Sequence, residues 1–169
     1  MKGKQMIRVG AGRIWPMFAA LAVLGCATVP PNSNEARNRE IGRAVLEEVL
    51  GRGRIAENEH LYAPTFVAHA GTRDATRAED RAATEGWRQA FPDLEVRVLR
   101  MAAENDLVAV HFTARGTNTG SGNGLPATGV SVEAGGITIF RVVDGRIVEE
   151  WTYTNFAEAY QRALAARAQ

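Results

Sequence analysis

The sequence predicts an α+β fold, a curled antiparallel sheet whose concave face is covered by the N-terminal helices. Apolar residues follow a helical spacing in the first half of the domain, up to about residue 90. Strand-like segments then follow one another almost to the C-terminus, joined by short turns. Helices first and strands afterwards is the order typical of α+β rather than alternating α/β proteins.

The first helix is expected over residues 35–50. Ile41, Val45 and Val49 repeat at intervals of four, which places them along one face of a helix. Glycines directly after residue 50 are expected to end it. A second, shorter helix is expected over residues 55–61.

The third helix has a clear N-terminal signal in Thr76-Arg77-Ala78-Glu79, which fits a capping box. Phe91-Pro92-Asp93 is expected to end this helix, because proline disfavours helical conformation in the residue before it. Asn155, followed three residues later by Glu158, is expected to cap a last helix over residues 156–166.

Four consecutive strands are expected between the third and the last helix. The first two span residues 94–102 and 107–116, and residues 117–128 form a glycine-rich loop of the kind found near a pocket mouth. The other two are the arms of a hairpin over residues 129–155. Asp144-Gly145 marks its turn, because a type I′ turn needs positive φ at both central positions.

The second arm of the hairpin is expected to carry a pocket wall. Strand alternation places Ile147, Glu149, Trp151, Tyr153 and Asn155 on one face, and Val148, Glu150, Thr152 and Thr154 on the other. The first set combines apolar rings with a phenol, an amide and a carboxylate. Such a mixture is typical of a ligand pocket, although packing in the core is the alternative.

Composition excludes several classes of protein. A length of 169 residues with 46% hydrophobic and 23% charged residues indicates one ordinary globular domain. The single cysteine, Cys26, excludes an intramolecular disulfide and a cysteine-cluster metal site. Four basic and no acidic residues precede Cys26, so the rest of the chain is mildly acidic, and nucleic-acid binding is not expected.

Residues 1–25 have the features of a secretory signal. Basic residues precede an apolar run from Met17 to Leu24 that is short for a membrane span. Val23-Leu24-Gly25-Cys26 resembles the lipobox of bacterial lipoproteins, which implies cleavage before Cys26 and its acylation. An ordinary signal peptide or an uncleaved anchor is the alternative.

The lipobox resemblance also implies a place in the cell. Residues 26–36 are expected to be a flexible tether, and residues 37–169 the folded domain. Acyl chains on Cys26 would hold the domain at a cell-envelope membrane. Ala27 and Thr28 include no aspartate that would mark retention in the inner membrane, so the outer membrane is expected in a host with two membranes.

Several segments, in the right order, resemble the SnoaL-like polyketide cyclases and their ester cyclase relatives. They are Tyr62-Ala63-Pro64-Thr65-Phe66-Val67-Ala68-His69, Ala90-Phe91-Pro92-Asp93-Leu94, the run from Leu107 to Gly120, Leu125-Pro126-Ala127-Thr128-Gly129, and the run from Ile137 to Trp151. The resemblance covers nearly all of residues 38–169. It implies the nuclear-transport-factor-2-like cone fold, in which homodimers through the sheet are common.

The resemblance also implies a catalytic pattern from which this chain departs. Characterised cyclases use a pocket aspartate near the end of the last strand as acid and base, whereas Thr152 to Asn155 include no acid. Asn118 stands where many relatives carry a histidine. Glu133 or Glu149 could replace the missing carboxylate if its side chain faced inward.

His69 and His111 are the candidate catalytic residues, because a histidine can act as acid or base near neutral pH. Either one could instead be structural. The expected ligand pocket contains Trp87, Phe91, Thr113, Asn118, Trp151, Tyr153 and Asn155. No metal site is expected, because no third ligand has a recognisable spacing from the two histidines, and no cofactor is expected.

Two functions remain open from the sequence. The first is an exported domain that binds a small, largely apolar molecule. The alternative is an enzyme of the cyclase, isomerase or hydratase type, with His69 or His111 as the base and Tyr153 and Asn155 as hydrogen-bond partners.

Overall fold

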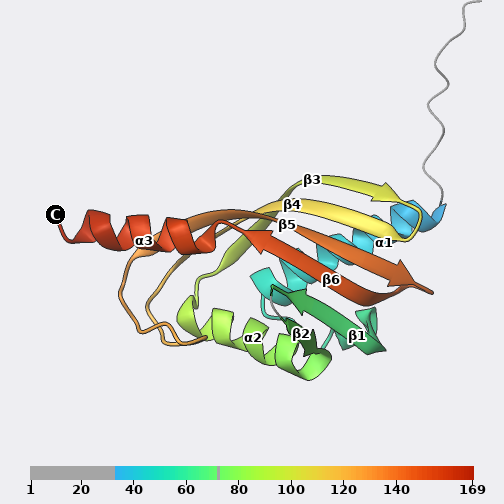
Figure 1. Ribbon diagram of the computed structural model, residues 1–169, viewed down its shortest axis with the longest axis horizontal. Coiled ribbons are helices and arrows are strands. Elements are labelled where there is room, and N and C mark those ends of the chain that lie inside the picture. Colours follow the sequence, from blue (N-terminus) through green and yellow to red (C-terminus); the bar gives the residue numbers. More distant parts are fainter. Residues whose placement is uncertain (1–32, 72) are drawn as a thin grey trace, which may run out of the picture. The chain divides into compact units, whose positions relative to one another are not determined.

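The computed structural model describes residues 33–71 and 73–169 (Figure 1). The expected signal over residues 1–25, the lipidation site Cys26 and most of the expected tether lie outside the described residues. The elements are α1 (Ser33–Ala44), η1 (Val45–Gly51), η2 (Glu59–Leu61), β1 (Tyr62–Ala70), β2 (Arg73–Thr76), α2 (Arg77–Ala90), β3 (Glu95–Glu104), β4 (Leu107–Thr117), β5 (Ser131–Val143), β6 (Arg146–Thr154) and α3 (Phe156–Arg167).

Six strands form one sheet in the order β2-β1-β6-β5-β4-β3. The four expected antiparallel strands are confirmed as β3 to β6. The sheet is larger and mixed, however, because β1 lies parallel to β6 and β2 pairs with β1 at the edge. The strand β1 was not expected from the sequence, because Pro64 is unfavourable inside a strand. Pro64 lies where the register between β1 and β6 shifts, a place that tolerates a residue without a backbone donor.

The first helix covers the expected range and begins earlier, at Ser33, so the last residues of the expected tether are helical. Its last turns, Val45–Gly51, are π-helical. Ile41, Val45 and Val49 are buried as their spacing predicts. Figure 1 shows α1 running along the sheet, and its Gly42 lies so close that an added Cβ would be 3.2 Å from Val110.

The capping box of α2 is confirmed. The backbone N–H of Thr76 donates to Glu79 Oε2 at 2.8 Å, and the backbone N–H of Glu79 donates to the Thr76 hydroxyl at 3.4 Å. The helix expected over residues 55–61 is reduced to the single 3₁₀ turn η2. None of the described helices is long and apolar enough to cross a membrane.

The hairpin forms with Asp144 and Gly145 at positive φ, as expected. A β-bulge changes the facing of its second arm: Arg141 pairs with Glu149, but Val142 pairs with Ile147, so Val148 has no partner. Ile147 therefore points into the core, whereas Glu149 lies on the opposite, outer face. The expectation that both share one face is wrong, because a strict alternation of two does not hold through a bulge.

The side chain of Asn118, which is 0% exposed, holds the glycine-rich segment after β4 in place through hydrogen bonds. Its amide nitrogen donates to the carbonyls of Ala90 and Gly120, at 3.1 and 3.0 Å. Its oxygen accepts from the backbone N–H and hydroxyl of Thr128 and from the Tyr160 hydroxyl, at 3.2, 2.7 and 3.1 Å. Asn118 thus joins α2, α3 and the loop, and is a structural residue rather than part of a pocket surface.

Close packing inside the sheet makes Gly136 a position that tolerates no side chain. A Cβ there would lie 2.7 Å from the Phe112 ring and 2.8 Å from the Tyr153 carbonyl oxygen. We expect Gly136→Ala to lower the free energy of unfolding by about 2 kcal/mol or more, measured by urea denaturation. Gly135→Ala is the control, because its Cβ would meet nothing closer than 3.8 Å. Equal losses in both variants would contradict this packing.

Candidate active site

A cavity of about 120 Å³ lies between the concave face of the sheet and the helices. Its wall is almost entirely apolar, and the side chains come from η1, α2, β4, β5, β6 and α3. The lining residues are Leu50, Trp87, Phe91, Leu94, Phe112, Ala114, Gly116, Val132, Ala134, Gly135, Thr152, Thr154 and Phe156. The site is therefore an apolar pocket with hydroxyl groups along one strand.

Three aromatic rings pack together at the helical side of the cavity. Trp87 meets Phe156 edge to face, with ring centroids 4.7 Å apart, and Phe91 meets Phe156 in the same manner at 5.9 Å. Such edge-to-face pairs fix the orientation of each ring. Trp87 and Phe91 thus both lie on the wall of the apolar cavity.

Glu150 is the carboxyl group that is hydrogen-bonded to a residue of the cavity wall, Thr152. It lies on the inward face of β6, and its Oε1 accepts a hydrogen bond from the Thr152 hydroxyl at 2.9 Å. The same hydroxyl lies 2.7 Å from that of Thr138, which is buried. Because Thr152 lines the cavity, its hydroxyl connects the cavity to the carboxyl group.

Burial and, to a smaller extent, the nearby negative charge of Asp80 raise the pKa of Glu150 to about 7. The hydrogen bond from Thr152 and the positive charge of Arg77 act in the opposite direction and are weaker. A carboxyl group with a pKa near neutral is half protonated under physiological conditions. It can therefore either donate or accept a proton, as a general acid–base group must.

Arg77 organises the acidic groups around Glu150. Its guanidinium donates to both oxygens of Glu59, at 3.1 and 2.9 Å, and to Asp80 at 2.6 Å, and it lies 3.5 Å from the centre of the Tyr62 ring. Burial raises the pKa of Asp80 despite Arg77. The single cation Arg77 thus lies among the carboxyl groups of Glu59, Asp80 and Glu150. This excess of negative charge favours a bound proton on the buried carboxyl groups, Asp80 and Glu150.

His69 lies on the outer face of the sheet, away from the cavity. Its Nδ1 is 2.8 Å from Asp74 Oδ1 and its Nε2 is 3.4 Å from Glu149 Oε1, while its ring stacks on Trp151 with centroids 4.7 Å apart. Arg141 Nε is 2.7 Å from the other oxygen of Glu149. These residues form a charged ladder across β2, β1, β6 and β5, and the expectation that Trp151 lines the pocket is wrong.

The other residues expected in the pocket are also placed elsewhere. His111 and Thr113 lie on the outer face of β4, where they pair with Ile137 and Gly135. Tyr153 is 66% exposed on the outer face of β6. Asn155 is exposed and does not cap α3 with its side chain. Its Oδ1 accepts from the backbone N–H of Gly135 at 2.8 Å.

Glu150 was missed because sequence reasoning chose the wrong face of the last strand. Aromatic residues at 151 and 153 suggested an inward face, whereas the structure turns Glu150, Thr152 and Thr154 inward. A signal was available: Thr138, Thr152 and Thr154 alternate with larger residues, and small hydroxyl side chains leave room for a cavity. Glu133 and Glu149, the carboxylates weighed as replacements, both face outward.

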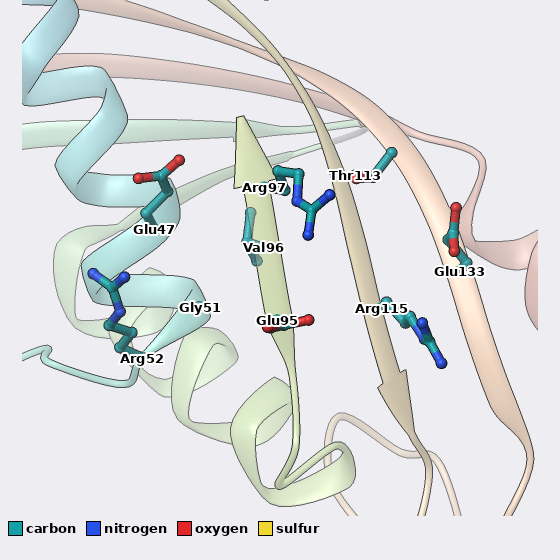
Figure 2. A pocket seen from close by; sticks show the side chains of 9 residues that line it. All are labelled: Glu47, Gly51, Arg52, Glu95, Val96, Arg97, Thr113, Arg115 and Glu133. Atoms are coloured by element: carbon teal, nitrogen blue, oxygen red, sulfur yellow. The ribbon is translucent and has the colours of Figure 1, made fainter. Parts of the chain in front are cut away.

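A second, polar cavity of about 390 Å³ lies at the sheet edge formed by β3. Figure 2 shows Glu47 and Arg52 projecting from η1 at one side, and Arg115 and Glu133 from β4 and β5 at the other. The remaining lining residues are Gly51, Glu95, Val96, Arg97 and Thr113. Thr113 thus lines a cavity, but not the apolar one. The described residues include no cluster of three or more side chains suited to a metal ion.

Comparison with known families decides the relationship of this chain. The family model for SnoaL-like polyketide cyclases matches residues 41–162, more than half of the sequence. The chain belongs to the SnoaL-like polyketide cyclase family. No curated protein matches the sequence.

Solved structures extend the SnoaL-like relationship. AclR from Streptomyces galilaeus, a candidate hydroxylase, is 27% identical and has a TM-score of 0.67, over 79% of this chain and 85% of that chain. IdmH from Streptomyces antibioticus, a candidate polyketide cyclase, is 28% identical with a TM-score of 0.66, over 76% and 98%.

Two further structures show the fold alone. A candidate SnoaL-like polyketide cyclase from Jannaschia is 24% identical with a TM-score of 0.72, over 80% of this chain and 96% of that chain. An epoxide hydrolase of the LEH-like type from M. tuberculosis is 16% identical with a TM-score of 0.61, over 80% and 97%. The α+β, nuclear-transport-factor-2-like fold expected from the sequence is confirmed.

The outer-face ladder predicts a pH dependence of stability. The hydrogen bond to Asp74 raises the pKa of His69 above its ordinary value, and the bond to Glu149 acts in the same direction. Protonated His69 therefore stabilises the folded state fully below about pH 6.5, the pKa of histidine in the unfolded chain. This stabilisation is lost as pH rises through the higher pKa of His69 in the folded chain. We expect His69→Gln to remove this loss from urea-denaturation curves recorded between pH 5 and 9. An unchanged pH dependence in that variant would show that His69 does not carry it.

Proposed function

We propose that this SnoaL-like domain is an acid–base enzyme of the cyclase or isomerase type, with Glu150 as the proton-transferring group. The observation that carries the proposal is the hydrogen bond between Glu150 and the Thr152 hydroxyl, which lines the apolar cavity. Glu150 takes the role that relatives give to an aspartate further along the strand. Its pKa of about 7 suits that role at neutral pH.

The chemistry follows from the hydrogen bond that links Glu150 to the cavity through the Thr152 hydroxyl. The ionised carboxylate accepts a proton from a carbon next to a carbonyl group, through the Thr152 hydroxyl, and leaves an enolate. The carboxylic acid then returns the proton to another atom of the substrate or of its cyclised product. Atoms and charge balance within this one exchange, and the oxidation state of the substrate is unchanged overall.

The histidine base considered from the sequence is not part of this proposal. His69 and His111 both lie on the outer face of the sheet, opposite the cavity. Binding of a small apolar molecule without turnover is the second candidate, because the same cavity wall offers mainly dispersion and hydrophobic contacts. The two candidates differ in one respect only, whether Glu150 moves a proton.

We further propose that the domain works at the cell envelope as a lipoprotein acylated at Cys26. The support is the match of Val23 to Cys26 with a lipobox behind a basic and apolar leader. Radiolabelled palmitate fed to cells of the native host is expected to label the full chain and not its Cys26→Ser variant. Equal labelling of both would overturn this localisation.

Deuterium exchange tests the enzymatic proposal without knowledge of the natural substrate. Cyclohexanone in D₂O with purified protein is followed by NMR for loss of its α-hydrogens. We expect catalysed exchange that falls about 10²-fold or more in Glu150→Gln, the usual contribution of a general acid–base group. Glu149→Gln is the matched control, because this neighbouring carboxylate faces the opposite side of the sheet.

The outcomes separate the two candidates. Exchange that is lost in Glu150→Gln and kept in Glu149→Gln supports proton transfer by Glu150. Binding of cyclohexanone without any catalysed exchange would leave the cavity as a binding site and refute the enzyme. Equal rates in wild type and Glu150→Gln would show that another group carries the reaction.

A further inference from the structure

The size of the apolar cavity limits what it can hold. Its volume of about 120 Å³ is well below the roughly 300 Å³ at which pockets for drug-sized ligands begin. An apolar protein cavity of about 150 Å³ takes up a single benzene molecule. This cavity therefore has room for about one ring, and a second fused ring would extend beyond it.

The chemistry of the wall limits the charge of the ligand. No acidic or basic side chain is among the residues that line the cavity. Burying an ionised group in such surroundings costs several kcal/mol unless an opposite charge pairs with it. The nearest ionisable group in the network is Glu150, which would repel an anion when ionised. The single cation of the neighbouring cluster, Arg77, is already bonded to Glu59 and Asp80.

The hydroxyl groups fix which end of a ligand is polar. Thr152 and Thr154 lie on the same face of β6, two residues apart, while Trp87, Phe91 and Phe156 form the opposing aromatic wall. The Thr154 oxygen already accepts from the backbone N–H of Phe156 at 3.4 Å. The Thr152 hydroxyl donates to Glu150 and lies 2.7 Å from the Thr138 hydroxyl, so it retains one lone pair that can accept a hydrogen bond from a ligand next to Glu150.

We infer that the cavity selects a neutral molecule of one ring, or an aliphatic chain of equal volume, with a single hydrogen-bonding group held at Thr152 and the apolar remainder against Trp87, Phe91 and Phe156. This inference rests on the proposed function, because it names the substrate class of the same site. It predicts discrimination by size and by charge.

Isothermal titration calorimetry with three probes tests the inference. 4-Methylphenol has one ring and one hydroxyl, 4-methylbenzoate has one ring and a charge, and 2-naphthol has two fused rings. We expect 4-methylphenol to bind at least ten-fold more tightly than either of the others at pH 7. Equal or tighter binding of 2-naphthol or 4-methylbenzoate would overturn the inference.

A cavity-filling variant shows where the probe binds. Ala134 lines the cavity, so Ala134→Leu is expected to weaken 4-methylphenol binding at least ten-fold, and Ala114→Val is a milder second variant in case the first fails to fold. Ala109→Val is the control, because Ala109 lies on the outer face of β4, where it pairs with Ile139, and does not line the cavity. Unchanged binding in both filled variants would place the probe elsewhere and refute the inference.

The failure of this inference can be told apart from failure of the proposed function. Binding is measured in Glu150→Gln as well as in wild type and needs no turnover. Selective binding of 4-methylphenol with no effect of Glu150 on deuterium exchange would refute only the acid–base role. Exchange that depends on Glu150, together with preferred binding of 2-naphthol, would refute only the ligand class.

Discussion

Asn118→Ala is expected to lower the free energy of unfolding by about 3 to 5 kcal/mol, the largest loss of stability among the variants considered. The side chain is fully buried and makes five hydrogen bonds that join α2, the loop after β4 and α3. Alanine leaves the carbonyl of Ala90 and the hydroxyl of Tyr160 without this partner in a region closed to solvent. Urea denaturation at pH 7 measures the loss.

Asn155→Ala provides the matched control for Asn118. This asparagine is exposed, and its side chain accepts one hydrogen bond, from the backbone N–H of Gly135. We expect a loss of about 1 kcal/mol, because water can replace that bond. If the two alanine variants lose similar stability, Asn118 is not the structural link that its contacts indicate.

Glu150→Gln is expected to stabilise the domain at pH 8 by roughly 1 to 3 kcal/mol and to leave its stability at pH 4 nearly unchanged. The pKa of Glu150 rises on folding from its ordinary value of 4.5 to about 7. Below pH 4.5 both folded and unfolded chains hold this proton. As pH rises to 7, the unfolded chain releases it first, so the stability of the wild type falls, and glutamine removes this penalty.

The neighbouring Glu149 serves as the control with the opposite sign. Its carboxylate lies 2.7 Å from Arg141 Nε and 3.4 Å from His69 Nε2 on the outer face, so Glu149→Gln is expected to lose a little stability at pH 8. A glutamine at 150 that destabilises the protein at pH 8 would mean that Glu150 is ionised and favourably paired in the folded state.

Much of the fold could be predicted because local signals agreed with the tertiary structure. The capping box at Thr76, the turn at Asp144 and the apolar repeat through Ile41 each form as expected. The parallel pairing of β1 with β6 could not be predicted in this way. It joins residues about 80 positions apart, and no local pattern encodes that contact.

The candidate site was harder to predict, because one β-bulge determines which residues face inward. Trp87 and Phe91 line the cavity at the end of α2, where helical spacing is regular. On β6 the unpaired Val148 interrupts the alternation of faces, so Ile147 points inward and Trp151 points outward. The aromatic side chains of Trp151 and Tyr153 therefore cover the outer face of the sheet instead of lining a pocket. The pKa of Glu150 depends on its burial and on the charge of Asp80 in α2, and only folding brings these two residues together.

An NMR titration of the Glu150 side-chain carboxyl carbon in the folded protein, assigned by comparison with Glu150→Gln, is the most direct test of the acid–base role of Glu150. We expect a midpoint near pH 7, because burial and the negative charge of Asp80 raise the pKa of this carboxyl group. In Asp80→Asn the midpoint is expected to move to lower pH, because that charge is gone. A midpoint near the ordinary value of about 4.5 would contradict the assignment of Glu150 as the acid–base group.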